Sequence, residues 1–182
     1  MLTTNEPSHG LLFGSFLYRA DLFEAEDLRI RWESLYGTGF SFAPEFNPLA
    51  AYYAHEMGNQ ESLLRIFFTT SESYPREYLL TTKLVMLEWE REWAIEDKRQ
   101  MNIDVGFLTA ENFLLATTKN YSHRVFLGQN IFADLTYYFH QGELQTFPWT
   151  YPDYLDPKKL EYFSWLRQYL LQSKSLFNRH TR

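Results

Sequence analysis

The chain has 182 residues, a formal net charge of −6, and 45% hydrophobic and 22% charged residues. This length favours one domain, and this composition excludes a mostly disordered or collagen-like chain. Aromatic residues reach 19%, so many rings are available to fill a core, and the lack of cysteine excludes disulfides and thiolate metal sites and fits a cytoplasmic location. We expect one globular domain over residues 1–182, with loosely ordered tails at 1–9 and 174–182.

The charge and apolar patterns narrow the class of partner. No apolar run approaches the roughly 18 residues that a membrane-spanning helix needs, and the N-terminus lacks the basic-then-apolar pattern of a secretory signal. Basic residues are scattered along an acidic chain, which argues against a nucleic-acid partner. We expect a cytoplasmic protein with no membrane partner, and the sequence leaves its oligomeric state open.

The chain begins with a strand and then a helix. Leu11–Leu17 is a short apolar run, typical of a buried strand. Asp21 and Glu24 have the spacing of a capping box, and Gly37 ends the helical pattern that follows them. The apolar residues of that pattern are Ala25, Leu28, Trp32 and Leu35.

A longer helix follows a less regular segment. Residues 40–46 predict an extended segment and 64–70 a strand, while 48–58 fit either a helix or a strand. Residues 76–96 give the longest helical pattern, which is apolar around most of its circumference. Its narrow polar arc consists of Glu77, Thr81, Glu88 and Glu92.

The second half reads as short strands followed by a closing helix. The predicted strands are 102–105, 113–118, 124–127, 131–139 and 144–147. Gln141-Gly142 is typical of a hairpin turn, and Asp156-Pro157 of a cap with proline at the first helical position. The sequence therefore predicts an α+β fold with a mixed or antiparallel sheet flanked by about three helices.

Several familiar motifs are absent. The sequence contains neither a P-loop nor a glycine-rich dinucleotide fingerprint, which excludes the common nucleotide cradles. His55-Glu56 begins like a zinc-binding helix, but Asn59 stands where the second histidine is required. Because no two histidines lie at ligand spacing, we predict no metal site, and the sequence identifies no cofactor.

One cluster of polar residues suits the binding of a ligand. Its members are Arg99, Asn102, Asp104, Lys119, His123 and Arg124. In a strand over 102–105, Asn102 and Asp104 share one face while the apolar residues beside them face the core. Gly106 permits a tight turn or a close backbone approach, and Lys119 ends an apolar run, so cationic groups converge on that face. These residue types suit a phosphate, with the acid orienting a hydroxyl or a metal.

Each candidate also has a structural interpretation. A carboxylate near lysine and arginine is often an ordinary ion pair. The aromatic-proline segment 149–154 is either a stacking platform or a lid on the core. A third candidate site lies at residues 52–58, where the structural interpretation is that Glu56 is an ordinary solvent-exposed charge.

The segments 99–108, 116–124, 148–154 and 52–58 together resemble a bacterial and archaeal family of about this length, the domain-of-unknown-function family 4416. The resemblance covers nearly the whole chain and implies no established reaction. The positions that match its motifs are Tyr53, Glu56, Arg99, Asn102, Asp104, Gly106, Lys119, His123, Arg124, Tyr151 and Asp153. The chain departs from the family pattern at Ala50-Ala51, Val105, Phe107 and Asp134.

The leading hypothesis is a protein that binds a small anionic ligand, phosphate-bearing or nucleotide-like. Lys119, Arg124 and Arg99 would supply charge, and Asn102 and Asp104 would orient the ligand. Tyr53, Glu56, Tyr151 and Asp153 complete the predicted binding residues. One alternative is a hydrolase or transferase that uses Asp104 and His123 as acid and base, with Mg²⁺ as a further option. Another is a protein–protein interaction module with no small-molecule site.

Overall fold

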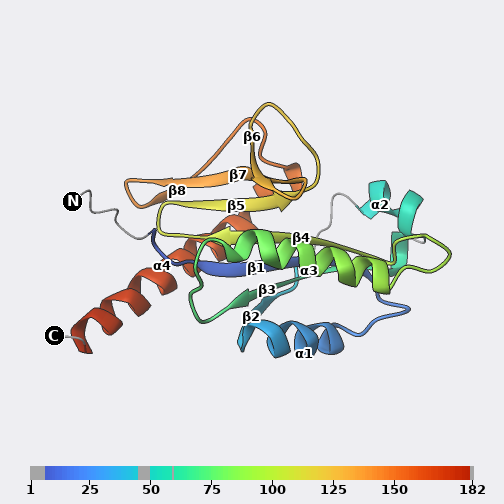
Figure 1. Cartoon of the computed structure of the whole chain (residues 1–182), viewed down its shortest axis with the longest axis horizontal. Helices are drawn as coiled ribbons and strands as arrows, with labels where there is room; N and C mark the ends of the chain where they lie inside the picture. The colour runs from blue at the N-terminus through green and yellow to red at the C-terminus, as the bar shows by residue number, and fades with distance from the viewer. Residues whose placement is uncertain (1–6, 45–49, 59, 181–182) are drawn as a thin grey trace.

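The computed structural model describes residues 7–44, 50–58 and 60–180. Within these residues, one sheet of eight strands is accompanied by four α-helices (Figure 1). The elements are β1 Leu11–Arg19, α1 Ala25–Tyr36, β2 Gly39–Phe42, α2 Ala50–Met57, β3 Leu63–Thr70, α3 Tyr78–Glu92, β4 Met101–Leu108, β5 Asn112–Thr117, β6 Arg124–Gly128, β7 Ile131–His140, β8 Glu143–Thr146 and α4 Pro157–His180. Short 3-10 helices lie at Gln60–Ser62 and Pro152–Leu155.

The strands follow the order β2-β3-β1-β4-β5-β7-β6, and every pairing between them is antiparallel. β8 pairs with Tyr137–His140 of β7, beyond the stretch Ile131–Asp134 that pairs with β6. The predicted α+β single domain is confirmed, and of the two expected sheet types the structure has the antiparallel one. Gln141 and Gly142 have φ of 51° and 90° at the turn between β7 and β8, so the predicted hairpin is also confirmed.

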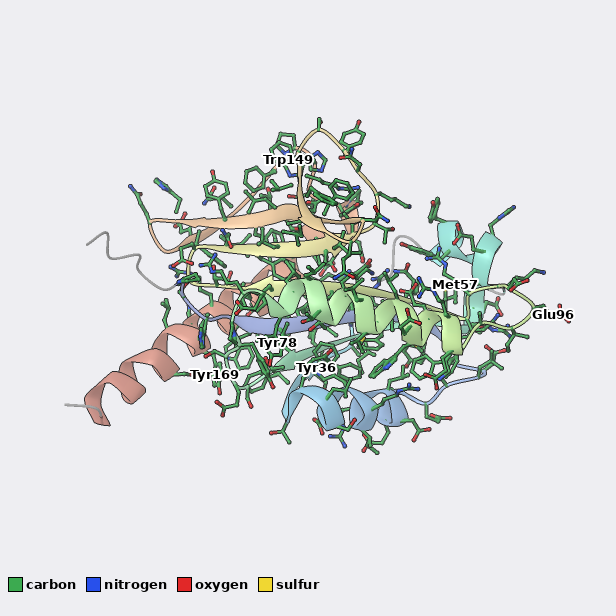
Figure 2. All side chains as sticks on the ribbon, in the orientation of Figure 1. Tyr36, Met57, Tyr78, Glu96, Trp149 and Tyr169 are labelled. Carbon is green, nitrogen blue, oxygen red and sulfur yellow. The ribbon has the colours of Figure 1, made fainter. Side chains whose placement is uncertain are left out.

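The sheet has a core on each face because the strands bury both sets of alternating side chains. On β1, Leu12 and Phe16 pack with α1 and α3, whereas Leu11 and Phe13 pack with α4. In Figure 1, α3 crosses in front of the sheet and α4 passes behind it. Figure 2 shows side chains filling the space between α1, α3 and the sheet, where Tyr36 is labelled. The central strands are thereby held rigidly from both sides.

The first helix forms where expected, but its start differs from the predicted capping box. Glu24 is itself the N-cap residue and makes no side-chain cap bond, while Asp21 forms an ion pair with Arg19. The capping-box prediction is therefore wrong, since the carboxylate of Asp21 already has a cationic partner outside the helix. The helix ends at Gly37, whose φ of 72° suits glycine.

The other predicted elements lie close to the observed ones. The undecided segment 48–58 forms α2 in its described part, and Phe46, which was expected in an extended segment, lies outside the described residues. The polar arc of α3 is exposed as predicted. The carboxylate of Asp156 accepts hydrogen bonds from the backbone N–H groups of Lys158 and Lys159, which confirms the cap of α4.

The two ends of the chain were expected to be loosely ordered. Residues 1–6 and 181–182 lie outside the described residues, while Ser8 donates a hydrogen bond to Glu111 and its carbonyl accepts one from Arg76. At the other end, α4 continues to His180. No helix in the described part of the chain combines the length and apolar character needed to cross a membrane.

Candidate functional site

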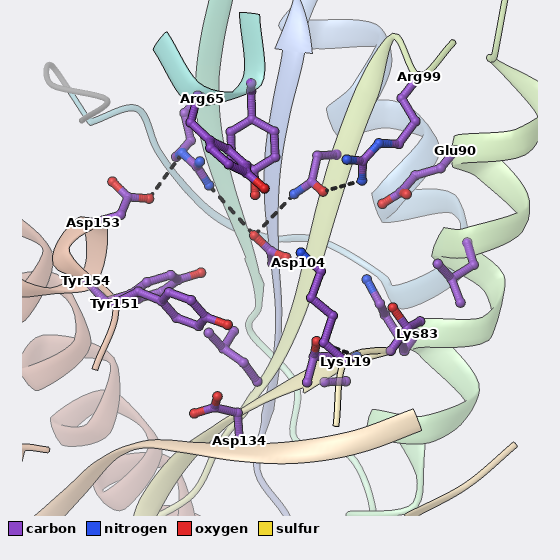
Figure 3. A pocket seen from close by; sticks show the side chains of 18 of the residues that line it. Arg65, Lys83, Glu90, Arg99, Asp104, Lys119, Asp134, Tyr151, Asp153 and Tyr154 are labelled. Carbon is purple, nitrogen blue, oxygen red and sulfur yellow. Dashed lines mark hydrogen bonds and ion pairs between the residues drawn. The ribbon is translucent and has the colours of Figure 1, made fainter. Parts of the chain in front are cut away.

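A pocket of about 420 Å³ lies where β4 extends beyond its pairing with β5, and it reaches from the α4 face of the sheet to α3 (Figure 3). Its floor comes from the first halves of β3 and β4 and the last residues of β5, and its walls from α2, α3, β7 and the segment 151–154. The floor is polar because β4 directs Asn102 and Asp104 to this face, while Ile103 and Val105 join the core on the other. The predicted sharing of one face by Asn102 and Asp104 is therefore confirmed.

The structure brings most of the predicted site residues to this pocket. Those that line it are Tyr53, Glu56, Arg99, Asn102, Asp104, Lys119, Tyr151 and Asp153. His123 and Arg124 lie behind the wall instead, where both contact Asp134. Asp104 and His123, the predicted acid and base, thus do not face the same space. Whether any of these residues contacts a ligand remains a prediction.

Arg65 is a buried cation at the pocket floor. One of its terminal nitrogens donates a hydrogen bond of 2.7 Å to the Ser15 hydroxyl, and the side chain is only 1% exposed. Its nitrogens lie 3.3 Å from Asp153 and 3.9 Å from Asp104, as ion pairs. Asp104 and Asp153 thus supply the counter-charge that a buried guanidinium requires, and Asp153 shares its charge with Lys159.

Asp153 also holds the segment 151–154 against α4. The Lys159 ammonium donates to the carboxylate of Asp153 and, at 2.8 Å, to its backbone carbonyl. Both side chains are almost fully buried. Burial lowers the pKa of Lys159, and the ion pair with Asp153 opposes that shift. This pair fixes the wall that carries Tyr151 and Tyr154.

Two charged residues of α3 bind the two backbone polar groups of one residue of β4, Ile103. The Lys83 ammonium donates to the carbonyl of Ile103 at 2.7 Å, and the Glu90 carboxylate accepts from its N–H at 2.6 Å. Burial raises the pKa of Glu90, while Lys83 and the N–H of Ile103 lower it. These contacts hold α3 in register beside the pocket floor.

The rim on the α2 side is closed by Arg99. Its guanidinium forms an ion pair with Glu56 and donates to the amide oxygen of Asn102 at 3.0 Å. The amide nitrogen of Asn102 donates in turn to Asp104 at 3.3 Å. A chain of contacts therefore links α2 to the centre of the pocket.

Three tyrosines surround Asp104 and stay neutral. Burial raises the pKa of Tyr53, Tyr151 and Tyr154, and the charge of Asp104 raises each further. The Tyr151 hydroxyl accepts a hydrogen bond from Arg124. The Tyr154 hydroxyl is buried and has no hydrogen-bond partner among the described residues. Neutral phenols remain hydrogen-bond donors, so this wall offers donors beside a carboxylate.

Asp134 connects the pocket to a stack of rings behind it. Its Oδ2 accepts a 2.9 Å hydrogen bond from Arg124 and lies 3.2 Å from the His123 ring, while its buried Oδ1 has no partner in the described ranges. The His123 ring stacks on Trp149 at 4.9 Å, and Trp149 stacks on Phe147 at 4.6 Å. Trp149 therefore stacks on the protein's own rings, whereas Tyr151 faces the pocket.

Lys119 differs from the other cations of the pocket. Its ammonium has no hydrogen bond or ion pair within the part of the chain that the structure describes, although its backbone carbonyl accepts a 2.9 Å bond from Arg124. Figure 3 shows its side chain pointing toward the middle of the pocket. A free ammonium beside a floor of polar groups is available to an anion.

Sequence reasoning missed several charged residues of this site. Arg65 and Lys159 lie in its buried network, and Lys83 and Glu90 line its wall. For three of them the sequence does contain a signal of burial: a charged residue stands at a position where the pattern of the strand or helix favours an apolar one. Arg65 interrupts the strand 63–70, and Lys83 and Glu90 lie outside the polar arc of their helix. A charge at such a position needs a buried partner.

The residues of the pocket do not form a metal site by their chemistry. Within residues 7–44, 50–58 and 60–180, no three histidine or acidic side chains gather closely enough to hold an ion. Four of the five carboxylates of the pocket instead have an arginine or lysine as ion-pair partner: Asp104 and Asp153 pair with Arg65, Asp153 also with Lys159, Glu56 with Arg99 and Asp134 with Arg124. The arrangement is suited to recognition through hydrogen bonds and charge.

The comparisons with known proteins identify a family. The model of the family described as Domain of unknown function (DUF4416) matches residues 10–169, which includes every residue of the pocket. No curated protein and no solved structure matches the chain.

Proposed function

The chain belongs to the DUF4416 family, and we propose that it binds a small anionic ligand, one that carries a phosphate or a similar group, in the pocket beneath Lys119. The observation that carries this proposal is the ammonium of Lys119, which has no partner among the described residues and points into a pocket of about 420 Å³. Pockets of this size accept small molecules. The lack of cysteine supports a cytoplasmic setting for this binding.

The other basic residues that line the pocket are less suited to make the first contact with an anion. Arg65 is held by Ser15 and two carboxylates, and Arg99 by Glu56 and Asn102. Lys83 donates to a backbone carbonyl. An anion would have to displace those partners, whereas Lys119 loses only solvent contacts. Arg65 and Arg99 would then add charge from the floor and the rim.

The test is calorimetric titration with inorganic phosphate and ribose 5-phosphate, combined with thermal unfolding. A ligand present at about 100 times its dissociation constant raises stability by about 2.7 kcal/mol. The Lys119→Met variant removes the ammonium but keeps most of the side-chain length, and we expect it to bind at least about tenfold more weakly.

Lys98→Met is the matched control, because Lys98 is exposed and lies outside the pocket. We expect this variant to bind as the unmodified protein does. If Lys119→Met binds both compounds as tightly as Lys98→Met, the assignment of Lys119 is overturned. If neither compound binds the unmodified protein, the proposal of a phosphate-bearing ligand is overturned as well.

A further inference from the structure

The charges that line the pocket indicate that a complementary ligand has other polar groups besides an anionic one. The acidic residues that line it are Glu56, Glu90, Asp104, Asp134 and Asp153, and the basic ones are Arg65, Lys83, Arg99 and Lys119. Arg124 and Lys159, behind the lining, balance part of this acidic charge. Asp104 is nevertheless partly exposed, and Oδ1 of Asp134 has no partner among the described residues, so a ligand with anionic groups alone would be repelled at these positions. A complementary ligand also carries hydrogen-bond donors.

Tyr154 and Asp104 define where such a donor fits. The Tyr154 side chain is buried, its residue being 3% exposed, and it lines the pocket with a hydroxyl that has no partner in the described structure. The Asp104 side chain is 35% exposed, so part of its carboxylate faces the open space. In Figure 3 both side chains point toward the same region of the pocket. A phenol that donates beside a carboxylate that accepts is the complement of a hydroxyl group, which needs one of each.

Asp134 supplies a second acceptor. Arg124 and His123 both contact its Oδ2, and its Oδ1 is buried without a partner among the residues described. A buried carboxylate oxygen without a donor is unfavourable, and a donor on a ligand relieves that cost. The pocket thus has two acidic positions for donors and, in Lys119, one position for an anion.

Resting on the proposed function, we infer that the ligand is a hydroxylated phosphate monoester of the sugar-phosphate class. Its phosphate contacts Lys119. One hydroxyl accepts from Tyr154 and donates to Asp104, and another donates to Asp134. Tyr154 and Asp134 thereby become ligand-binding residues that no sequence pattern identified.

The experiment compares four probes by calorimetry: ribose 5-phosphate, n-pentyl phosphate, inorganic phosphate and unphosphorylated ribose. n-Pentyl phosphate matches the carbon count of ribose 5-phosphate but has no free hydroxyl. We expect the unmodified protein to bind ribose 5-phosphate at least about tenfold more tightly than n-pentyl phosphate, because the hydroxyls satisfy buried groups.

Tyr154→Phe tests the predicted hydroxyl contact directly. We expect about a fivefold to tenfold loss of affinity for ribose 5-phosphate and no change for inorganic phosphate. Because the hydroxyl has no partner within the described residues, the ligand-free variant should melt no lower than the unmodified protein. Tyr162→Phe is the matched control: its hydroxyl is hydrogen-bonded to Thr69 at 2.9 Å and lies outside the pocket. It should melt at a lower temperature and bind ribose 5-phosphate normally.

The outcomes separate this inference from the proposed function. Equal affinity for ribose 5-phosphate and n-pentyl phosphate, with Lys119→Met weakening both, overturns the hydroxyl contacts and supports the anion site. Binding of ribose as tight as that of ribose 5-phosphate overturns the phosphate contact and with it the ligand class. Should Tyr154→Phe fail to fold, Asp104→Asn replaces it, and we expect a loss of at least about tenfold for ribose 5-phosphate alone.

Discussion

Asp153 and Lys159 form an ion pair in which the first side chain is 1% exposed and the second 0%. The pair joins the segment 151–154 to the first turn of α4, and Asp153 also approaches Arg65 on β3 at 3.3 Å. Two neighbouring elements and the distant strand β3 therefore meet at one carboxylate. Because each charge is buried, the pair positions the pocket wall more than it adds to net stability.

The first prediction concerns this carboxylate. Asp153→Asn keeps the shape of the side chain but leaves Lys159 and Arg65 buried without a full counter-charge. We expect the free energy of unfolding in urea to fall by about 3–5 kcal/mol, the usual cost of removing one partner of a buried pair.

Glu88→Gln is the control, since the ion pair of Glu88 with Arg91 is about two-thirds exposed at both side chains. We expect no measurable change in unfolding for this variant. A loss for Asp153→Asn no larger than that for Glu88→Gln would show that the buried network does not hold the wall.

The second prediction is a pH dependence that originates at Glu90. Burial raises its pKa above the ordinary 4.5, so the folded protein binds a proton there more readily than the unfolded chain does. Its contribution to stability is therefore full below pH 4.5 and is lost as the pH rises through the raised value. The carboxylate also accepts from the Ile103 N–H, a bond that a glutamine oxygen can replace.

We therefore expect the stability difference between the unmodified protein and Glu90→Gln to change with pH. Urea unfolding at steps from pH 4.5 to 7 should show the unmodified protein losing stability relative to Glu90→Gln. A difference that stays constant over this range, or that changes in the opposite direction, contradicts the assignment. Glu88→Gln, at an exposed position of the same helix, is the reference, and its stability difference from the unmodified protein should not change over this pH range.

Much of the fold and part of the site could be predicted from local sequence patterns. The period of two along 102–105 placed Asn102 and Asp104 on one face, and the helical period of 76–96 gave its exposed arc. Lys119, at the end of the apolar run, was expected to turn toward the face of Asn102 and Asp104, and all three line one pocket. These inferences succeed because each depends on the geometry of a single element.

The rest of the site depends on pairs that no local pattern contains. The partners of Arg65 are Ser15, Asp104 and Asp153, which lie on other strands and a distant 3-10 helix. The apolar pattern of β3 indicates that Arg65 is buried, but the identity of its partners follows only from how the strands are placed together. The prediction that His123 acts with Asp104 rested on their proximity in the sequence. The register of β6 with β7 instead places Arg124, the residue after His123, opposite Asp134.

The third prediction concerns Gly106. The sequence indicated a tight turn or a close approach, and the structure shows a close approach inside β4. A Cβ atom there would lie 2.5 Å from the Phe113 ring and 3.0 Å from the Phe13 ring. Gly106→Ala must displace rings in a packed core, so we expect a loss of about 1–3 kcal/mol in the free energy of unfolding.

The double variant Gly106→Ala/Phe113→Leu distinguishes crowding from a backbone effect. If the ring causes the loss, the added cost of Gly106→Ala should shrink when Phe113 is already leucine, as a double-mutant cycle measures. An equal cost in both backgrounds would mean that contact with Phe113 does not explain why glycine is present.

The fourth prediction concerns Asp134, where β7 meets the chain that carries His123 and Arg124. Its Oδ2 is the acceptor for the Nε of Arg124 at 2.9 Å, and Arg124 in turn contacts Tyr151. Asp134→Asn removes the counter-charge of a guanidinium whose side chain is only 8% exposed. We expect the free energy of unfolding to fall by about 3 kcal/mol or more.

The same substitution should release Tyr151 from its position at the pocket wall, because Arg124 is the group that holds its hydroxyl. Glu111→Gln is the control: the carboxylate of Glu111 pairs with Arg76 but is 57% exposed, so this variant should unfold close to the unmodified protein. Aromatic proton signals of Tyr151 measured by NMR should shift in Asp134→Asn and not in Glu111→Gln. Unchanged Tyr151 signals together with unchanged stability would show that Asp134 does not organise this wall, and that the Lys119 carbonyl and the Tyr151 hydroxyl suffice to hold Arg124.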